Sequence, residues 1–309
     1  MTDPERHYRH MLFDNARWRD FTPRDGDILV ATGYKSGTTW TQMICALLVH
    51  QTTQLPAPLS VLSPWLEMRT RPVDLVLASL EQQTHRRLIK SHTPLDGLPW
   101  WDNVTYLVCG RDPRDAFVSF HDHIDNTDQA RARVLFDAQG LDIHDQAPLP
   151  EDIDDRLEHW LSEASFPWEQ DGAPYWSVFH HAETFWAARH RPNVHFLHYA
   201  DLVADLPGQM RGLAERLGLA VTEGSWPALT SAARFEAMRA RADDLAAESD
   251  QGLWRDNRSF FRHGEVGRWR SRLSEESQEL YAAVTRSRYD PVMLDWLERG
   301  SAAGDPKAI

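Results

Sequence analysis

Cysteine, long apolar runs and basic charge are all scarce in this 309-residue sequence. The two cysteines, Cys45 and Cys109, lie singly in apolar segments, which excludes a disulfide framework and a zinc site built from cysteine clusters. The longest apolar run covers residues 43–49, whereas a transmembrane helix needs roughly 20 apolar residues. We therefore expect both cysteines to be core residues and the chain to have no stable membrane insertion.

The charge balance and the N-terminus narrow the class of protein further. The chain has 33 basic and 46 acidic side chains and a formal net charge of −13, so nucleic acid is not an expected partner. Any anionic ligand must be bound by locally concentrated basic groups. The N-terminal sequence MTDPERHYRH lacks the apolar stretch of a secretory signal peptide, so we expect a cytoplasmic location. At 42% hydrophobic and 26% charged residues, the composition is typical of a globular chain.

Basic residues are concentrated in three segments. The first covers residues 86–92, the second contains Arg111 and Arg114, and the third covers residues 255–272. The third segment has six arginines against two acidic residues, a local charge of +4. It is either a solvated cationic surface or part of an anion-binding site.

Two other segments are expected to lie outside the packed part of the chain. Residues 142–158 are rich in acids and prolines, which indicates an exposed insertion or mobile loop that we place at about 125–172. We also expect the C-terminal tail, residues 299–309, to be disordered. The acidic segment is not a candidate for binding an anion.

Strand and helix patterns alternate along most of the chain. Residues 27–31 form a short apolar run, and a helical pattern follows at 38–50. Further runs typical of strands buried on both faces occupy residues 88–91, 104–110 and 194–199. The alternation predicts a single α/β domain, with a central parallel sheet flanked by helices and ligands bound beyond the carboxyl ends of the strands.

The loop after the first expected strand reads GYKSGTTW, residues 33–40. A glycine-containing turn that leads into a helix presents unpaired N–H groups and the positive end of the helix dipole to an anion. The pattern predicts a P-loop-like phosphate site in which Lys35, Thr38 and Thr39 add donors, but a simple turn with a helix N-cap has the same residues. It is not a Walker A motif, because Lys35 precedes Ser36 and Gly37.

The next expected strand ends in KSHTPLDGLP, residues 90–99. Lys90 and His92 are two residues apart, so both side chains can point to one face of the sheet while Ser91 points to the other. At a strand end beside an anion site, a neutral imidazole can accept a proton from a hydroxyl group near pH 7. His92 is therefore the candidate general base.

The third expected strand leads into CGRDPRDAFVSF, residues 109–120. Asp112 followed by proline predicts the start of a helix that runs to about residue 123. Arg111 offers a planar guanidinium and Ser119 a hydroxyl, which together predict a second phosphate site. Two phosphate sites indicate a bisphosphorylated nucleotide as the ligand.

Four segments together resemble a known family. KSGTTW, KSHTPLDGLP, RDPRDAFVSF and FFRHGEVGRW follow one another between residues 33 and 269. They are similar to the four signature segments of the cytosolic-type sulfotransferases, which use 3′-phosphoadenosine 5′-phosphosulfate (PAPS). The segments SPWLEMRTRPVD and FLHYAD most resemble the actinobacterial glycolipid sulfotransferases of that family.

The resemblance implies a role for each matching residue. The 5′-phosphosulfate would be held by Lys35, Ser36, Gly37, Thr38 and Thr39. The 3′-phosphate would be held by Arg111, Ser119, Arg262, His263 and Gly264. The adenine would be held by Trp40 and Phe235, with Met238 nearby and Tyr199 reaching the base. The family usually has lysine at the position of His263 and aspartate at that of Arg268, so the 3′-phosphate contact is where this chain departs from the pattern.

The resemblance also implies the reaction, transfer of a sulfuryl group to a hydroxyl with 3′,5′-bisphosphate (PAP) as product and no metal required. In-line displacement moves negative charge onto the leaving oxygen while the acceptor hydroxyl loses a proton. His92 would accept that proton, and Lys35, assisted by Lys90, would stabilise the charge. The expected acceptor is a glycolipid or another lipophilic alcohol, although a phenol or a small natural product would use the same machinery.

Two other function classes follow from the residues alone. A P-loop kinase of a small hydroxylated acceptor would need Mg²⁺ beside an acidic strand end, but the expected strands end at Ser91, Gly110 and Tyr199. A non-enzymatic nucleotide-binding module would not need His92 beside the anion site.

Aromatic and histidine residues near the motifs are secondary candidates. Five tryptophans could line an acceptor pocket or belong to the core: Trp65, Trp100, Trp101, Trp168 and Trp176. His121 and His123 are two apart on an expected helix, so they face different directions and cannot share a metal.

Overall fold

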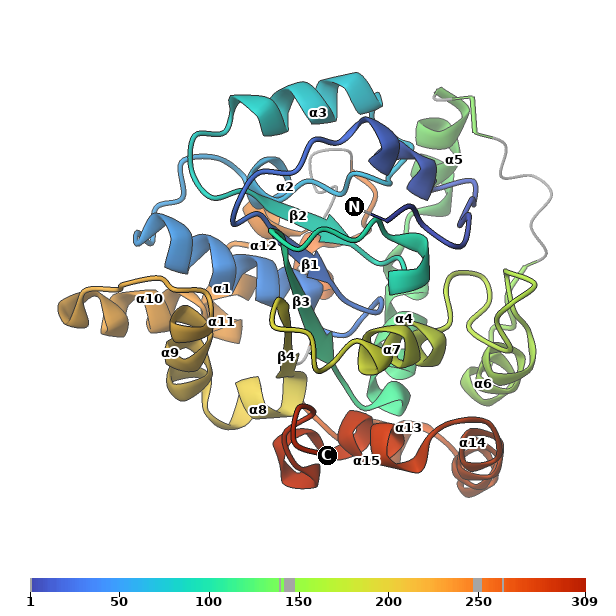
Figure 1. The fold of residues 1–309 in the computed structure, drawn as a ribbon. Coiled ribbons are helices and arrows are strands. Elements are labelled where there is room, and N and C mark those ends of the chain that lie inside the picture. The colour runs from blue at the N-terminus through green and yellow to red at the C-terminus, as the bar shows by residue number, and fades with distance from the viewer. Residues whose placement is uncertain (1, 139, 142–147, 247–251, 263) are drawn as a thin grey trace.

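The computed structural model describes residues 2–138, 140–141, 148–246, 252–262 and 264–309. In these residues a sheet of four parallel strands has the order β2-β1-β3-β4 (Figure 1). The strands are β1 (Ile28–Ala31), β2 (Leu88–Ser91), β3 (Thr105–Gly110) and β4 (Val194–His198). The predicted single α/β domain with a central parallel sheet is therefore confirmed.

The strands are buried on both faces, as their apolar sequences predict. Ile28 and Val30 of β1 belong to one core cluster, and Leu29 and Ala31 belong to another. Successive side chains of a strand point to opposite faces, so one short run of apolar residues supplies both cores. This is why the strand lacks the alternation of apolar and polar residues that marks a half-exposed sheet.

Helices cover both faces of the sheet. They are α1 (Thr38–His50), α2 (Leu59–Leu62), α3 (Val73–Gln82), α4 (Pro113–Asn126), α5 (Gln129–Ala138), α6 (Ile153–Ser162), α7 (Val178–Ala187), α8 (Tyr199–Ala204), α9 (Leu206–Arg216), α10 (Trp226–Ala232), α11 (Phe235–Ala240), α12 (Ala242–Leu245), α13 (Trp269–Arg272), α14 (Glu275–Arg288) and α15 (Pro291–Arg299). Short 3-10 helices include η1 (Asn15–Asp20), η2 (Leu95–Gly97), η3 (Glu223–Ser225), η5 (Asn257–Phe260) and η6 (Gly300–Ala303).

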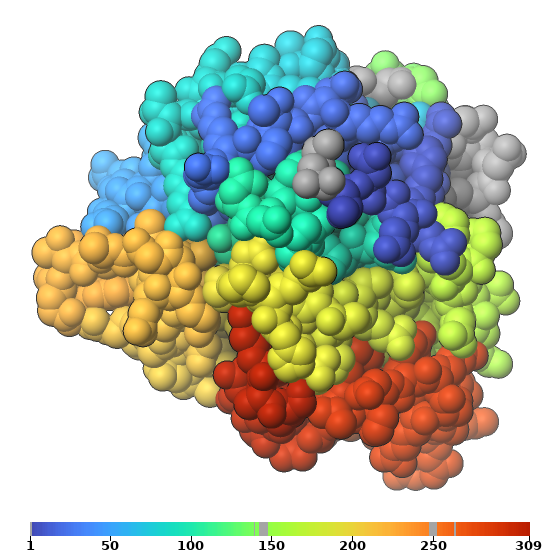
Figure 2. Space-filling model, viewed as in Figure 1, coloured from blue at the N-terminus to red at the C-terminus, as the bar shows by residue number. Residues whose placement is uncertain are grey.

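Most of these helices fall into two groups around the sheet. Helices α1 and α8–α12 share the core cluster of Ile28, whereas α4, α6, α7 and α13–α15 share a separate aromatic-rich cluster. Figure 1 shows the second group to the right of and below the sheet, with α9–α11 to the left. In the space-filling view the C-terminal segment forms the lower surface and α9–α10 project from the left side (Figure 2).

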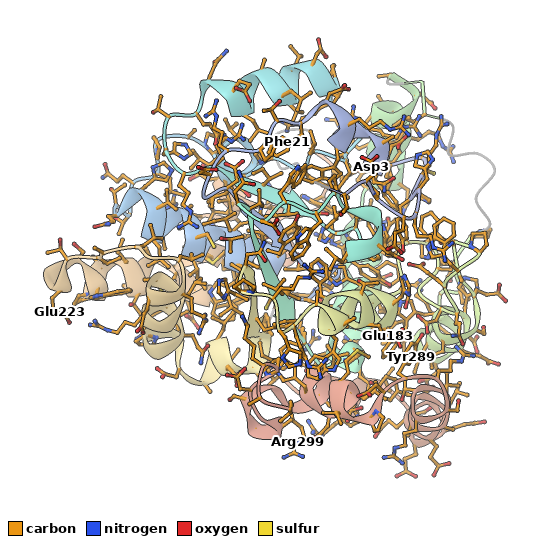
Figure 3. The ribbon with its side chains drawn as sticks, in the orientation of Figure 1. Asp3, Phe21, Glu183, Glu223, Tyr289 and Arg299 are labelled. Atoms are coloured by element: carbon orange, nitrogen blue, oxygen red, sulfur yellow. The ribbon has the colours of Figure 1, made fainter. Side chains whose placement is uncertain are left out.

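The C-terminal helices dock against α7 through aromatic contacts. The ring of Tyr289 stacks on Phe179 with centroids 4.7 Å apart, and its hydroxyl donates to the buried carboxylate of Asp171. Figure 3 shows Tyr289 close to Glu183 of α7. The last third of the chain is thus packed onto the domain and not appended to it.

The two segments expected to lie outside the packed domain differ from that expectation. Within the described part of 125–172, the chain forms α5 and α6, and residues 142–147 lie outside the described residues. The expected disorder of 299–309 is wrong: the tail begins with η6, and Ile309 packs against the aromatic-rich cluster. Ser301 also donates to Asp201 through its backbone N–H (3.1 Å) and its hydroxyl (2.7 Å). None of the described helices is long and apolar enough to cross a membrane.

Candidate active site

The candidate site lies along one edge of the sheet, at the carboxyl ends of its strands. The loop after β1 contains Lys35, β2 leads into His92, β3 into Arg111 and β4 into Tyr199. The sheet order places β1 between β2 and β3, and β4 beside β3, so the four segments are neighbours. The structure therefore brings together residues that are far apart in the sequence, as the strand pattern predicts.

The loop after β1 is shaped by two left-handed residues, Lys35 with φ of 60° and Gly37 with φ of 95°. A Cβ atom on Gly37 would lie 2.9 Å from Cδ2 of Tyr199, so a side chain there meets both backbone strain and a steric clash. The hydroxyls of Thr32 and Thr38 lie 2.6 Å apart and tie the two ends of the loop together.

Helix α1 begins directly after this loop. Its N-cap is Gly37, and within the described residues no side chain caps its first turn. The first backbone N–H groups of a helix have no partner inside the helix, and the dipole makes this end positive. The loop and the helix start are therefore able to bind an anion, and Lys35 and Thr39 beside them favour this interpretation over a simple turn.

His92 is fixed by its Nδ1 atom, which lies 2.8 Å from the backbone carbonyl oxygen of Thr32. A carbonyl oxygen only accepts, so Nδ1 carries the proton and Nε2 keeps a free lone pair. Burial and the neighbouring ammonium of Lys90 lower the pKa of His92 well below its usual range. The imidazole is therefore neutral at physiological pH, and Nε2 is able to accept a proton.

Lys90 lies on the same side as His92. Its ammonium is 4.5 Å from the ring centre of Trp65, and that ring also meets His92 edge-on at 5.0 Å. Ser91, between them, instead donates to Oε1 of the buried Glu67 at 2.5 Å. Lys90 and His92 therefore lie on one side and Ser91 points to the other, as the two-residue spacing predicts.

Lys35 extends from the loop to a residue that the motifs did not single out. Its Nζ atom lies 3.1 Å from His123 Nδ1 and 5.0 Å from the ring centre of Phe260. Burial, followed by the positive charges of Arg111 and Lys90, lowers the pKa of Lys35 to about 7. A signal for His123 was present in the sequence, because it stands four residues after Ser119 and hence on the same face of α4.

Arg111 connects the loop to the basic segment at 255–272. Its Nη1 donates to the carbonyl oxygen of Lys35 at 2.9 Å, and Nη2 donates to that of Glu265 at 3.4 Å. The guanidinium lies 4.1 Å from the ring centre of Tyr199. Its Nε atom is buried and has no partner in the described part of the chain. A buried, unpaired N–H is unfavourable, so this donor is suited to an anion.

The residues expected around an adenine gather on one side of the loop. Trp40, Tyr199 and Met238 belong to one core cluster, and Phe235 packs against it. The rings of Trp40 and Tyr199 meet edge-on at 5.3 Å. A Cβ atom on Gly264 would lie 2.5 Å from Cγ of Phe235, so this ring rests directly on the Gly264 backbone.

The basic segment at 255–272 is only partly available to a ligand. Arg262, Arg268 and Arg272 each place Nη1 within 2.9 to 3.2 Å of the Asp122 carboxylate on α4. Although burial opposes it, the hydrogen bond from Arg268 and the charges of all three arginines hold the pKa of Asp122 below its usual value. Arg262, expected at a 3′-phosphate, is thus paired with Asp122, and His263 lies outside the described residues.

The five candidate tryptophans divide between the site and the core. Trp65 and Trp176 lie 5.0 and 5.9 Å from the ring of His92. Trp100 stacks on Tyr106 and Trp168 on Phe166, and Trp101 belongs to the core cluster that contains Leu29 of β1. Trp65 and Trp176 are therefore the two that can contact an acceptor near His92.

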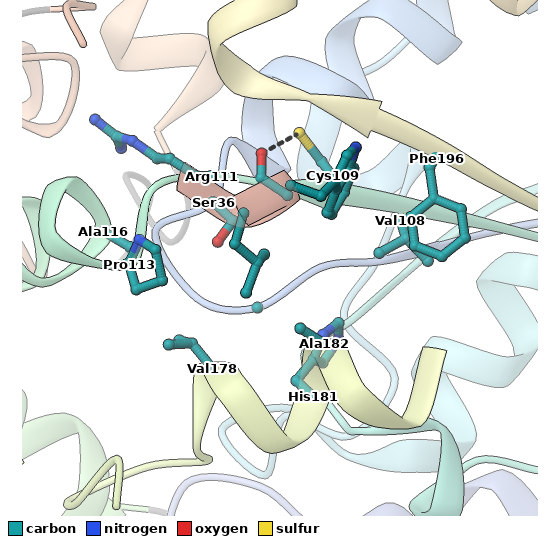
Figure 4. A pocket seen from close by; sticks show the side chains of 14 residues that line it. Ser36, Val108, Cys109, Arg111, Pro113, Ala116, Val178, His181, Ala182 and Phe196 are labelled. Atoms are coloured by element: carbon teal, nitrogen blue, oxygen red, sulfur yellow. Dashed lines mark hydrogen bonds between the residues drawn. The ribbon is translucent and has the colours of Figure 1, made fainter. Parts of the chain in front are cut away.

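Behind the loop is a small cavity lined by Ser36, Cys109, Arg111 and His181 among others. Figure 4 shows Val178, His181 and Ala182 of α7 on the side of the cavity opposite Ser36, and the Arg111 guanidinium pointing away from them. His181 Nε2 is buried there without a partner among the described residues. In the part of the chain that the structure describes, no cluster of three or more His, Cys, Asp or Glu side chains could hold a metal ion.

Comparisons with known proteins agree with this arrangement. Residues 25–293 match a family described as the sulfotransferase domain. The chain is 38% identical to a glycolipid sulfotransferase of Mycobacterium bovis (strain BCG / Pasteur 1173P2), over 97% of this chain and 96% of that protein.

Two solved structures share the fold. A complex of retinol dehydratase with retinol and PAP has a TM-score of 0.66 and 23% identity, and the match covers 90% of this chain and 88% of that one. Mouse sulfotransferase SULT7A1 complexed with PAP has a TM-score of 0.66 and 19% identity, over 90% of each chain. At these identities the likeness concerns the fold.

Proposed function

Because this chain belongs to the sulfotransferase domain family and is a sulfotransferase, we propose that its sulfuryl donor is PAPS and its acceptor a glycolipid hydroxyl. Membership decides against the kinase and the non-enzymatic binding module. One observation carries the proposal: an ammonium, a neutral imidazole and a guanidinium meet around one loop, since Arg111 binds the carbonyl of Lys35 and His92 binds that of Thr32.

The residues present fit such a sulfuryl donor. The uncapped first turn of α1 and the side chains of Ser36, Thr38 and Thr39 would hold the 5′-phosphosulfate. The unpaired Nε of Arg111 would serve the 3′-phosphate together with Ser119 on α4. Two solved structures of the same fold are complexes with PAP, which supports this placement.

The proton of the acceptor hydroxyl would go to His92. Nδ1 is bound to the carbonyl oxygen of Thr32, so Nε2, which has a free lone pair, is the atom that can accept this proton. Trp65 and Trp176 lie beside this ring and would provide apolar surface for the acceptor. A positioned general base of this kind contributes roughly 10²- to 10⁴-fold to the rate.

Charge developing on the leaving oxygen would be met by Lys35, with Lys90 assisting. Bound PAPS supplies the activated sulfuryl group, and the chain supplies the donors that lie where negative charge grows. Removing one such preorganised donor typically costs about 3 to 4 kcal/mol of transition-state stabilisation. The ammonium of Lys35 is held in place before any ligand binds, which favours this role.

The test is transfer of label from radiolabelled PAPS. The purified protein is incubated with a lipid extract and, separately, with simple phenols, and the products are separated by chromatography. We expect label in a glycolipid fraction, strongly reduced by Lys35→Met and unchanged by Lys307→Met, which alters an exposed lysine of the C-terminal tail. Label that reaches phenols but no lipid would overturn the acceptor, and label that reaches neither would overturn the proposed donor chemistry.

A further inference from the structure

The ammonium group of Lys35 lies between two side chains from distant parts of the chain. His123 Nδ1 on α4 is 3.1 Å away, and the ring centre of Phe260 in η5 is 5.0 Å away. Lys35 reaches them from a backbone with φ of 60°, a conformation that is uncommon for a residue with a Cβ atom. The unusual backbone and the two contacts together fix where this cation stands.

Lysine is a rare residue in this chain. Of its 33 basic residues only Lys35, Lys90 and Lys307 are lysines, and two of these three lie at the candidate site. An ammonium is a compact charge that one nitrogen acceptor can hold, whereas a guanidinium is a broad planar fork. The Nδ1 atom of His123 accounts for one of the three N–H donors of this ammonium.

His123 is in the protonation state that such a contact needs. Burial and the neighbouring Lys35, Lys90 and His92 lower its pKa well below the usual range, so the ring is neutral. When Lys35 is protonated it only donates, so Nδ1 of His123 then carries the lone pair and Nε2 the proton. The ring itself is fixed by Trp254 at 4.5 Å and Phe260 at 5.9 Å between centroids.

We propose that His123 is a positioning residue for Lys35: its Nδ1 accepts a hydrogen bond from the ammonium and holds this cation at the reaction edge before the sulfuryl donor arrives. The proposal rests on the proposed function in one respect, that Lys35 is the group that meets the leaving oxygen. It adds a residue outside the signature segments to the machinery that places this charge.

The electrostatic surroundings explain why Lys35 needs a partner. The charges of Arg111 and Lys90 face its ammonium, His92 is neutral, and Asp122 on α4 acts in the opposite direction. Burial and the two cations lower the pKa of Lys35, and a hydrogen bond that favours the charged form opposes this shift. Without an acceptor at His123, Lys35 should lose its proton at a lower pH.

The first measurement follows this proton without any ligand. With only three lysines, a protein labelled in the lysine side chains gives three ε signals, and Lys35→Met identifies the one of interest. Three variants are compared: His123→Leu removes the acceptor, His123→Asn places an amide oxygen near Nδ1, and His190→Leu is the control. His190 is exposed and precedes β4, at the opposite edge of the sheet.

We expect the titration midpoint of Lys35 to fall in His123→Leu, to return toward the wild-type value in His123→Asn and to stay unchanged in His190→Leu. In the wild-type protein, ring nitrogen shifts should report the proton of His123 on Nε2 and that of His92 on Nδ1. For sulfuryl transfer at neutral pH, we expect kcat to fall about 10- to 100-fold in His123→Leu, the effect of losing a hydrogen bond to a charged group. The KM for PAPS should change much less, and the alkaline limb should move to lower pH.

An unchanged Lys35 midpoint in a folded His123→Leu protein would overturn the proposal, as would a wild-type His123 with its proton on Nδ1. If His123→Leu does not fold, the wild-type tautomer and the midpoint in His123→Asn decide between the two outcomes. A wild-type protein that transfers no sulfuryl group would contradict the proposed function, while the titration would still decide the contact.

Discussion

His92 and His123 lie at the same edge of the sheet but use opposite ring nitrogens. His92 donates from Nδ1 to the carbonyl of Thr32, whereas His123 accepts at Nδ1 from Lys35. Both rings are neutral because burial and nearby cations lower their pKa values. At the scale of single residues, the hydrogen-bond partner of each ring therefore decides its role. One imidazole can take a proton from a substrate hydroxyl, and the other can bind an ammonium.

A substitution of His92 can keep its hydrogen bond to Thr32 and remove the basic Nε2 atom. In His92→Asn the side-chain amide can still donate toward Thr32, but nothing replaces Nε2. We expect kcat to fall roughly 10²- to 10⁴-fold while the affinity for 3′,5′-bisphosphate stays that of the wild type, as measured by steady-state kinetics and calorimetry. A variant with kcat within about tenfold of wild type would show that His92 is not the base.

Lys35 should take up a proton when a nucleotide binds. Its pKa of about 7 means that most of the population is neutral at about pH 8, and a bound anion favours the charged form. The bisphosphate should therefore bind with uptake of up to about one proton at this pH, at which His92 is neutral before binding. Calorimetry in buffers of different ionisation enthalpy measures the uptake, and it should vanish in Lys35→Arg, whose charge does not titrate.

Residues inside local motifs could be predicted from the sequence, and their partners could not. Lys35, His92 and Arg111 each follow a short apolar strand, so their common edge follows from the parallel order of the sheet. The contact between Lys35 and His123 joins residues 88 positions apart and depends on how α4 packs. The pairing of Arg262 with Asp122 is likewise tertiary, and no local pattern indicated it.

At the scale of elements, the helix from Thr38 to His50 and the strand from Leu88 to Ser91 lie where the sequence predicts them. A glycine turn marks the start of the helix, and the buried run LIKS marks the strand. The start of α1 is also the most constrained part of the candidate site, because Gly37 combines a left-handed backbone with a close approach to Tyr199.

A pair of glycine substitutions separates these two constraints. Gly37→Ala forces a Cβ atom to 2.9 Å from the Tyr199 ring at φ of 95°, whereas Gly218→Ala has φ of 64° and no atom within 4 Å. We expect Gly218→Ala to cost about 1–2 kcal/mol of stability and to leave bisphosphate affinity unchanged. Gly37→Ala should also displace Tyr199 and weaken bisphosphate binding. Thermal melting compares the stability of the two variants and calorimetry compares their affinity for the bisphosphate. Equal affinities would contradict this prediction.

At the scale of the whole molecule, α4 joins parts of the chain that are distant in sequence. Asp122 binds three arginines from 255–272, and the next residue, His123, contacts Lys35. The C-terminal tail is held in a similar long-range way, through Ser301 on Asp201 and the carbonyl of Ile309 on Arg189. Its small polar residues predict disorder, but these contacts, about 100 positions apart, override the local preference.

Deleting residues 300–309 tests this packing. The deletion removes the hydrogen bonds to Asp201 and the apolar contact of Ile309, so we expect the free energy of unfolding to fall by about 1–3 kcal/mol. The single change Lys307→Ala removes one exposed contact and should stay within about 0.5 kcal/mol of wild type. Thermal melting checks both, and a truncated protein as stable as the full chain would mean that the tail contributes nothing.

The depressed pKa of Lys35 has a consequence for the idle enzyme. Near neutral pH, a sizeable share of molecules carries an amine instead of an ammonium at position 35, and His92 and His123 are uncharged beside it. These molecules must take up a proton from solvent when the nucleotide binds, so nucleotide binding depends on pH. At alkaline pH the affinity for 3′,5′-bisphosphate should therefore fall, because each binding event must also supply the proton of Lys35.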